Sequence, residues 1–286
     1  TWLLNRRNGR LRPGSSEWHS APWACHQCRE PFKPEDSTCR GCGEGLANIR
    51  QAALAQLDHA SSVLENLSLA RPGQAIREAL DAVAAEAAGS PGSVRTAAGD
   101  VSTEAGVQAI VGGAVDALGG LDVVVNVAGV LSFGHAHETT LEEWNRLIGI
   151  NLTGTFLMCR EALPHLLASK GNIVNVASTA AHAGQPWALA YTASKGGVLA
   201  MTRELAVEYA KAGVRCNSVS PGAIDTPITS AFHVPEGADA KLIQRVMPLG
   251  AFGTPEGIAA AIAFIASEEA SHMNGADIRM DGATLS

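Results

Sequence analysis

From about residue 74 to the C-terminus, helical and strand patterns alternate, and this alternation constrains the fold more than any other feature of the sequence. Apolar residues recur at helical spacing in some segments and form short apolar runs in others. The patterns predict helices at 74–87, 103–118, 140–169, 189–212 and 255–267, and strands at 93–101, 121–129, 172–178, 213–222 and 276–280. Apolar runs such as LDVVVNVAG are typical of strands covered on both faces. We therefore predict an α/β fold with a doubly wound, Rossmann-like parallel sheet.

The first 50 residues differ in composition from the rest of the chain. They contain 8 Lys/Arg and 5 Asp/Glu, so they carry +3, whereas the whole chain carries −7. They also hold four of the six cysteines and three of the five tryptophans. Such a shift marks a domain boundary. We predict a Cys-rich segment at 1–45, a helical linker at 46–73 and the α/β domain at 74–286.

The Cys-rich segment contains two pairs of cysteines with the spacing of zinc ligands. Cys25 and Cys28 form one pair, Cys39 and Cys42 the other, and ten residues separate the pairs. Four thiolates suit a tetrahedral structural Zn²⁺, and a segment with so few apolar residues needs a staple of this kind. The glycines of RGCGEGLA, at 40–47, offer a competing interpretation as a nucleotide-binding turn. The segment before them, CREPFKPED, has two prolines and many charges, so it does not suit a buried strand, and a four-cysteine zinc-ribbon-like segment is the better prediction.

The clearest chemical signal is the pair Tyr191 and Lys195, four residues apart at the start of a predicted helix. Residues at this spacing lie on one helix face. A neighbouring ammonium favours the ionised phenol, so Lys195 is expected to lower the pKa of Tyr191 toward the working range of an acid-base group. Ser178 ends the preceding strand, and its hydroxyl together with the phenol would hold a carbonyl or alcohol oxygen. The pattern predicts acid-base chemistry on such an oxygen.

Residues 74–286 resemble the classical short-chain dehydrogenase/reductase family. The resemblance rests on the Asp100-Val101 pair, NVAG at 126–129, NLTG at 151–154, Ser178, the Tyr191-x-x-x-Lys195 motif and PGAIDTP at 221–227, in the family's order. It implies hydride transfer between NAD or NADP and an alcohol or ketone, and a homo-oligomer, either a dimer or a tetramer. The implied catalytic residues are Asn151, Ser178, Tyr191 and Lys195. The implied cofactor-binding residues are Asp100, Val101, Asn126, Ala128, Gly129, Lys195, Pro221, Gly222, Ile224 and Thr226.

The resemblance fails at the glycine-rich turn that receives the cofactor's pyrophosphate at a helix N-terminus in this family. The expected window, at about 46–60, contains no glycine, and none occurs between Gly45 and Gly73. We therefore predict an N-terminally incomplete sheet and impaired cofactor binding. Two alternatives stay open. One is a non-catalytic binding protein that combines a zinc ribbon with a dehydrogenase-like domain, and the other is the product of a truncated or frame-shifted gene.

Partners and location are predicted from what the chain lacks. No apolar stretch reaches the roughly 18 to 20 residues of a membrane span and the N-terminus has no apolar signal-peptide core, so we expect a cytoplasmic protein without a membrane partner. Residues 23–42 also resemble the zinc fingers of the Ran-binding nucleoporin type, but Phe32 replaces that family's Asn. With a net charge of −7, a nucleic-acid partner is not expected. The substrate side would be bordered by His135, His137, Gln185, Trp187 and the segment 228–247.

Overall fold

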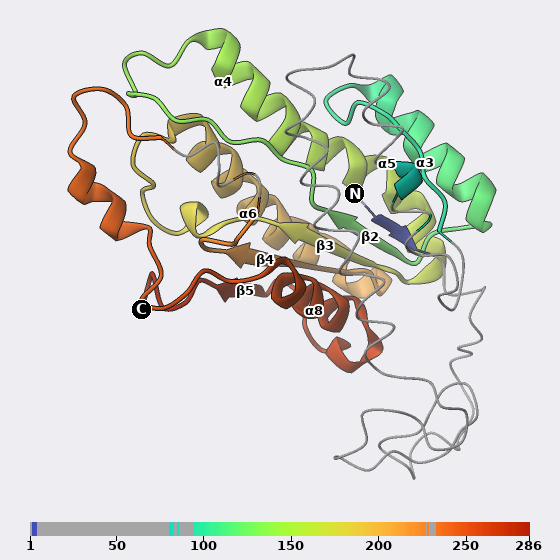
Figure 1. Cartoon of the computed structure of the whole chain (residues 1–286). Helices are drawn as coiled ribbons and strands as arrows, with labels where there is room; N and C mark the ends of the chain where they lie inside the picture. Colours follow the sequence, from blue (N-terminus) through green and yellow to red (C-terminus); the bar gives the residue numbers. More distant parts are fainter. Residues whose placement is uncertain (1, 5–79, 83–84, 86–93, 227, 229–232) are drawn as a thin grey trace.

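The computed structural model of the chain describes residues 2–4, 80–82, 85, 94–226, 228 and 233–286. Its centre is a five-stranded sheet in the order β1-β2-β3-β4-β5 (Figure 1). The strands are β1 (Trp2–Leu4), β2 (Val123–Asn126), β3 (Asn172–Val176), β4 (Arg215–Pro221) and β5 (Asp277–Met280). Strands β2 to β5 are parallel, whereas β1 runs antiparallel to β2. The predicted α/β fold with a parallel sheet is confirmed, with β1 as an antiparallel addition.

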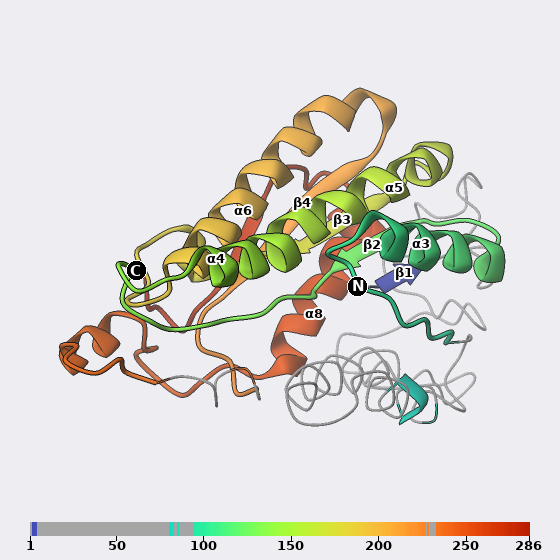
Figure 2. The ribbon, with the colours of Figure 1, turned by 90° about the horizontal axis from the view of Figure 1, so that it is seen from above.

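Helices cover both faces of the sheet. The helices α3 (Glu104–Leu118), α5 (Gly154–Ser169) and α6 (Leu189–Tyr209) lie side by side on one face, and α8 (Pro255–Ala266) lies on the other (Figure 2). Side chains alternate between the two faces because successive residues of a strand point in opposite directions. Val124, Ile173 and Cys216 are therefore buried in the cluster that contains α3 and α5, while Val123, Val174 and Val219 are buried against α8.

The long helix predicted at 140–169 is present and is interrupted by one wider turn. It consists of α4 (Leu141–Ile148), a π-helical turn at Gly149–Thr153, and α5. Thr140 begins it by accepting a hydrogen bond from the backbone N–H of Glu143 at 3.1 Å. Single π-turns within α-helices are frequent at functional sites. The turn contains Asn151, which is fully buried.

The strand predicted at 93–101 is wrong for the residues that are described there. Residues 94–100 form no strand, and all but Val94 are exposed. The edge of β2 where a further strand would pair is taken by β1, whose residues pair with Val123–Val125. A stretch with one branched apolar residue, whose expected place beside β2 is occupied, gains little from joining the sheet. The residues of β1 come from the segment that the sequence assigns to the Cys-rich region.

Several sequence predictions fall on residues that lie outside the described part of the chain. They include Cys25, Cys28, Cys39, Cys42 and the linker at 46–73. Of the helix predicted at 74–87, residues 80–82 and 85 are described, and they are helical. Within the described ranges, no helix is both long enough and apolar enough to cross a membrane.

Candidate active site

Ser178, Tyr191 and Lys195 meet where β3 ends and α6 begins. Ser178 starts the 3-10 turn η4 (Thr179–Ala181), and its Oγ accepts a hydrogen bond from the backbone N–H of Ala180 at 3.1 Å. The hydroxyl of Ser178 lies near enough to the phenol of Tyr191 to act on its pKa, which it lowers. Lys195 lies one helical turn after Tyr191, and its Nζ is 5.8 Å from the centre of the tyrosine ring. The structure thus brings together the three residues of the predicted acid-base group.

Lys195 is a buried cation at the edge of this group. Its residue exposure is 5%, and its Nζ donates a hydrogen bond to the carbonyl oxygen of Val176 at 2.8 Å. Burial disfavours a charged amine, and it lowers the pKa of Lys195 from 10.5 to about 8. The site therefore holds an ammonium that loses its proton more readily than a lysine in water.

The pKa of Tyr191 moves in the direction opposite to the sequence expectation. Burial raises the pKa of the phenol above its ordinary value of 10.0, and the hydrogen bond from Ser178 opposes this rise. The loss of phenolate hydration is the larger effect. Lys195 does not reverse it, since its Nζ is hydrogen-bonded to the carbonyl of Val176 and not to the phenol. The expectation that Lys195 brings the pKa of Tyr191 below 10 is therefore not met in this arrangement of the residues.

Asn151 joins the loop after β2 to helix α6. Its Oδ1 accepts a hydrogen bond from the N–H of Val130 at 2.8 Å, and its Nδ2 donates to Val130 O at 2.9 Å and to the Oγ of Ser194 at 3.0 Å. The amide thus binds the backbone of one segment and the side chain of another. It holds the loop at the π-turn, close to Lys195, and the catalytic role implied by the resemblance stays a prediction.

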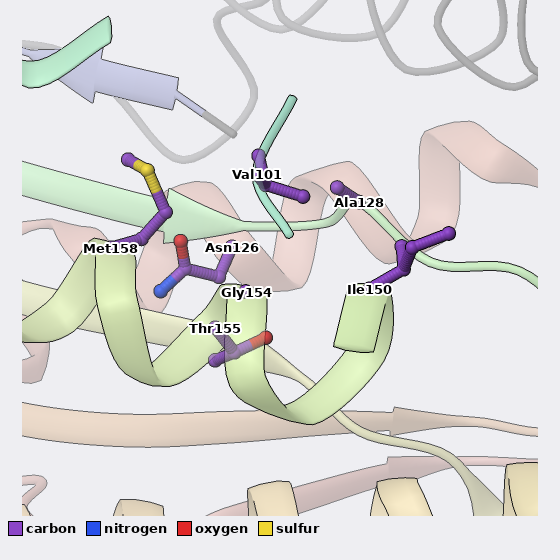
Figure 3. A pocket seen from close by; sticks show the side chains of 7 residues that line it. All are labelled: Val101, Asn126, Ala128, Ile150, Gly154, Thr155 and Met158. Atoms are coloured by element: carbon purple, nitrogen blue, oxygen red, sulfur yellow. The ribbon is translucent and has the colours of Figure 1, made fainter. Parts of the chain in front are cut away.

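The carboxyl end of β2 borders a narrow pocket (Figure 3). Its lining residues come from the ends of three segments and are Val101, Asn126, Ala128, Ile150, Gly154, Thr155 and Met158. Three predicted cofactor-binding residues are among them. The Oδ1 of Asn126 is buried and has no hydrogen-bond partner among the described residues. Next along the loop, a Cβ on Gly129 would lie 3.3 Å from Asn151 Oδ1 and 3.4 Å from Lys195 Nζ, so the glycine leaves space directly beside the ammonium.

The remaining predicted cofactor residues lie at two other places. Asp100 is exposed before α3, and its Oδ1 accepts hydrogen bonds from the N–H and the hydroxyl of Ser102. Pro221 ends β4 and Gly222 follows it, with the N–H of Gly222 donating to Met280 O at 3.0 Å. The side chain of Ile224 is buried in the core against α8, so this residue would meet a ligand through its backbone. Thr226 follows it, with its hydroxyl 3.4 Å from Ile224 O.

The predicted substrate border is built from loops that contact one another. The N–H of Gly134 donates to Trp187 O at 2.8 Å, and a ring nitrogen of His135 lies 2.9 Å from Glu236 O. The rings of His135 and His137 are stacked at 5.5 Å. These contacts join the loop after β2 to the loop before α6 and to the segment after β4. In the part of the chain that is described, no group of three or more His, Cys, Asp or Glu residues is placed to hold a metal ion.

Sequence reasoning missed a polar cluster centred on Asp277. Its carboxylate lies 2.9 Å from His182 Nε2 and accepts hydrogen bonds from the hydroxyls of Ser218 and Ser220. The histidine and the aspartate are 95 residues apart, and no spacing motif joins them. The pairing of β5 with β4, which sets Ser218 opposite Asp277, brings the cluster together.

Comparisons with known proteins agree with this geometry. A family model described as enoyl-(acyl carrier protein) reductase matches residues 67–283. The 2-(R)-hydroxypropyl-CoM dehydrogenase of Xanthobacter autotrophicus is 42% identical over 189 residues, which cover 64% of this chain and 75% of that protein. The 3-ketoacyl-(acyl-carrier-protein) reductase of Brucella melitensis, solved with NADH, superposes with a TM-score of 0.64 at 33% identity and covers 72% of this chain and 84% of that one.

A short-chain type dehydrogenase/reductase from Mycobacterium marinum superposes similarly, with a TM-score of 0.66 at 32% identity, and covers 73% of this chain and 82% of that one. The family match spans most of the chain and includes Ser178, Tyr191 and Lys195 in their predicted order. This protein therefore belongs to the short-chain dehydrogenase/reductase family.

Proposed function

We propose that the protein is an NAD(P)-dependent oxidoreductase that interconverts a small-molecule alcohol and the corresponding ketone. The observation that carries this proposal is the meeting of Ser178, Tyr191 and Lys195 at the carboxyl ends of the parallel strands, where ligands bind in open α/β sheets. The similarity to a dehydrogenase and to an NADH-bound ketoacyl reductase supports the reaction class.

Each of the three side chains has a distinct task in this proposal. The phenol of Tyr191 takes the proton of the alcohol during oxidation and returns a proton to the carbonyl oxygen during reduction. The hydroxyl of Ser178 donates a hydrogen bond to that oxygen or to the phenol and so favours the charged form of either. The ammonium of Lys195 supplies positive charge behind the phenol. A bound nicotinamide cofactor would accept or supply the hydride.

The residues present fit the nicotinamide half of such a cofactor. Lys195 Nζ has three donors, and the hydrogen bond to Val176 O occupies one of them. Gly129 leaves space beside this ammonium, and Asn126 presents a buried oxygen without a partner among the described residues. We propose that Lys195 holds the ribose of the nicotinamide and that the carboxyl end of β2, with Asn126, Ala128 and Gly129, forms the floor of the cofactor cleft.

The pyrophosphate half lacks the usual anchor in the sequence, because the window at 46–60 contains no glycine. Each charge-assisted hydrogen bond that is lost costs roughly 1.5 to 3 kcal/mol. We therefore propose that cofactor binding is weaker than in relatives that have the glycine-rich turn. The alternative of a non-catalytic binding protein predicts no cofactor binding at all.

Titration of the full chain with NADH and NADPH separates these possibilities. Tryptophan fluorescence and calorimetry should show saturable binding of at least one of the two cofactors below millimolar concentration. Tyr191→Phe should then lower kcat about a thousandfold at an unchanged cofactor Kd, because the acid-base group is lost and the binding surface is kept. Tyr209→Phe alters the second of the two tyrosines in the chain and serves as the control. No binding up to millimolar cofactor, or full turnover by Tyr191→Phe, would contradict the proposal.

We also propose that Cys25, Cys28, Cys39 and Cys42 bind one structural Zn²⁺. The support is their spacing, two Cys-x-x-Cys pairs separated by ten residues. Elemental analysis of the purified chain should give one zinc per chain, and the double substitution Cys25→Ser with Cys39→Ser should remove it. A zinc content near zero in protein purified without chelators would refute this assignment.

Finally, we propose a homo-oligomer built on the two long helical segments of the domain. Large apolar side chains are exposed on both of them, including Phe156 on α5 and Val207 on α6. Light scattering after gel filtration should give the mass of a dimer or a tetramer, and Phe156→Glu should lower it. A monomer at micromolar concentration would contradict this part of the proposal.

A further inference from the structure

The carboxylate of Asp277 is the centre of a buried polar cluster that the proposed reaction does not use. The side chain of Asp277 is 7% exposed, and both serines that donate to its Oδ1, Ser218 and Ser220, are fully buried. His182 Nε2 lies 2.9 Å from its other oxygen, Oδ2, and 3.3 Å from the hydroxyl of Ser220. Burial of a carboxylate is costly unless its oxygens are paired. His182 is therefore held by a carboxyl group that two buried serines fix in the sheet.

His182 in turn ends the short turn that carries Ser178. The turn η4 is closed by hydrogen bonds from Ala181 N to Ser178 O at 2.9 Å and from His182 N to Thr179 O at 3.0 Å. Inside it, the N–H of Ala180 points at Ser178 Oγ. Since Ser178 Oγ accepts from this N–H, its own proton is available for the phenol of Tyr191. A contiguous set of contacts thus runs from the β4–β5 pair through His182 and η4 to Tyr191.

We propose that His182, held by Asp277, is a positioning residue that fixes the direction of the Ser178 hydroxyl toward Tyr191. This inference rests on the proposed function for its catalytic meaning. The η4 turn packs against α6 and β4, and the His182–Asp277 contact joins its end to β5, so we expect the direction of the Ser178 hydroxyl to depend on this contact. When the His182–Asp277 contact is lost, η4 can rotate, and the hydrogen bond between Ser178 and Tyr191 weakens.

A direct titration of Tyr191 tests this proposal without cofactor or substrate. The chain has two tyrosines, so Tyr209→Phe leaves Tyr191 as the one phenol whose ultraviolet absorbance rises on ionisation. The hydrogen bond from Ser178 favours the phenolate. In this background, Ser178→Ala and His182→Leu should each raise the apparent pKa of Tyr191 by about half a unit to one unit. The double variant should show little further rise, since both changes remove the same hydrogen bond.

Two further variants separate positioning from a general effect on the fold. In His182→Gln the amide can still donate to Asp277, so the pKa of Tyr191 should stay near that of the parent. His165→Leu alters a half-buried histidine near the C-terminal end of α5 and should also leave the pKa of Tyr191 unchanged. Circular dichroism over the same pH range reports whether each variant is folded. If His182→Leu does not fold, Asp277→Asn, which weakens the same contact at constant size, replaces it.

The proposal is overturned if folded His182→Leu titrates like its parent, or if its effect adds fully to that of Ser178→Ala. Kinetics then give the catalytic consequence. In otherwise wild-type protein, His182→Leu should lower kcat about tenfold or more, with KM for the substrate little changed, and His182→Gln should restore most of it. Absence of turnover in the wild-type protein would refute the proposed function, whereas the Tyr191 titration would still decide the positioning role.

Discussion

Two groups of buried polar side chains contact adjacent residues of β3, and their hydrogen bonding differs. At the penultimate residue of the strand, Asn175 Oδ1 accepts a hydrogen bond from Asn126 Nδ2 at 2.9 Å, and its Nδ2 donates to Thr202 Oγ1 at 2.9 Å. At the last residue of the strand, the buried Lys195 has one hydrogen bond within the described part of the chain, to Val176 O. In the first group both polar atoms of the Asn175 side chain are paired, although the Oδ1 of Asn126 has no partner among the described residues, whereas the second group contains a lysine with donors to spare.

The comparison separates polar groups that serve the fold from polar groups that serve the chemistry. A satisfied buried amide stabilises one arrangement of the strands and helices, because any other arrangement leaves its donors or acceptors unpaired. A buried ammonium with few partners destabilises the fold, and the lowered pKa of Lys195 reflects the same loss of hydration. Functional sites commonly retain such unfavourable groups. Substitution of Lys195 should therefore raise stability and lower turnover, whereas substitution of Asn175 should mainly lower stability.

Lys195→Met is expected to have the largest effect. The lowering of the lysine pKa from 10.5 to about 8 corresponds to about 3 kcal/mol at neutral pH, so the free energy of unfolding should rise by up to about this amount when the charge is removed. Turnover should fall about a hundredfold or more, because the phenol of Tyr191 loses the positive charge near it. Urea unfolding at pH 7 and steady-state kinetics measure the two effects on the same protein.

The stability difference between wild type and this variant should depend on pH. Between about pH 8 and 10.5 the unfolded wild-type chain binds more protons at Lys195 than the folded chain does. The free energy of unfolding of the wild type should therefore rise with pH in this range, relative to that of Lys195→Met. The difference between the two proteins should thus be largest below pH 8 and vanish near pH 10.5. A Lys195→Met variant that is less stable than wild type at pH 7 would contradict the comparison.

Asn175→Ala should show the opposite behaviour. It leaves the Nδ2 of Asn126 without its oxygen partner and removes a donor to Thr202, so we expect a loss of about 3 kcal/mol in the free energy of unfolding. Turnover per folded molecule at saturating cofactor should fall much less than in Lys195→Met, since Asn175 reaches the proposed site through its hydrogen bond to Asn126 and has no described hydrogen bond to the acid-base group. Thr202→Val removes the hydroxyl that accepts from Asn175 but keeps the size of the side chain, so it should lower the free energy of unfolding by less than Asn175→Ala does. If Asn175→Ala unfolds at the same midpoint concentration of urea as the wild type, the hydrogen bonds of Asn175 do not stabilise the fold.

The order of helices and strands was predictable because the spacing of apolar residues and the residues that begin and end helices agree over long segments. The helix expected at 140–169 and the strand expected at 172–178 are found at Leu141–Ser169 and Asn172–Val176. The strand expected at 93–101 failed, since a short segment with weak alternation is decided by which edge of the sheet is open. No local pattern reveals that β1, at Trp2–Leu4, takes that edge, because its pairing with β2 joins residues more than 100 positions apart.

The site was predictable where its residues are close in sequence and not where they are distant. Tyr191 and Lys195 share a helix face, so their spacing alone places them together. His182 and Asp277 meet because of the pairing between β4 and β5, which no spacing reveals. The sign of the Tyr191 shift also required the structure, since it depends on how far burial outweighs a neighbouring charge.

Gly129→Ala is expected to have the smallest effect, and it tests whether the space beside Lys195 binds the cofactor. Gly129→Ala places a methyl group 3.3 Å from Asn151 Oδ1 and 3.4 Å from Lys195 Nζ, distances that the neighbours can relieve by small shifts. The free energy of unfolding should therefore change by less than about 1 kcal/mol. Cofactor affinity should fall about tenfold, because the methyl group occupies space beside the donor that is proposed to hold the ribose.

Gly112→Ala is the matched control for Gly129→Ala, because a Cβ at this exposed position of α3 meets no atom within 4 Å. It should raise the free energy of unfolding by about 0.5 to 1 kcal/mol, since alanine favours the helix, and leave cofactor binding unchanged. Calorimetric titration and urea unfolding of the two variants then give a direct contrast. Equal cofactor affinity in both would mean that the space beside Lys195 is not part of the cofactor cleft, and that the buried ammonium must be explained by substrate binding or by proton transfer alone.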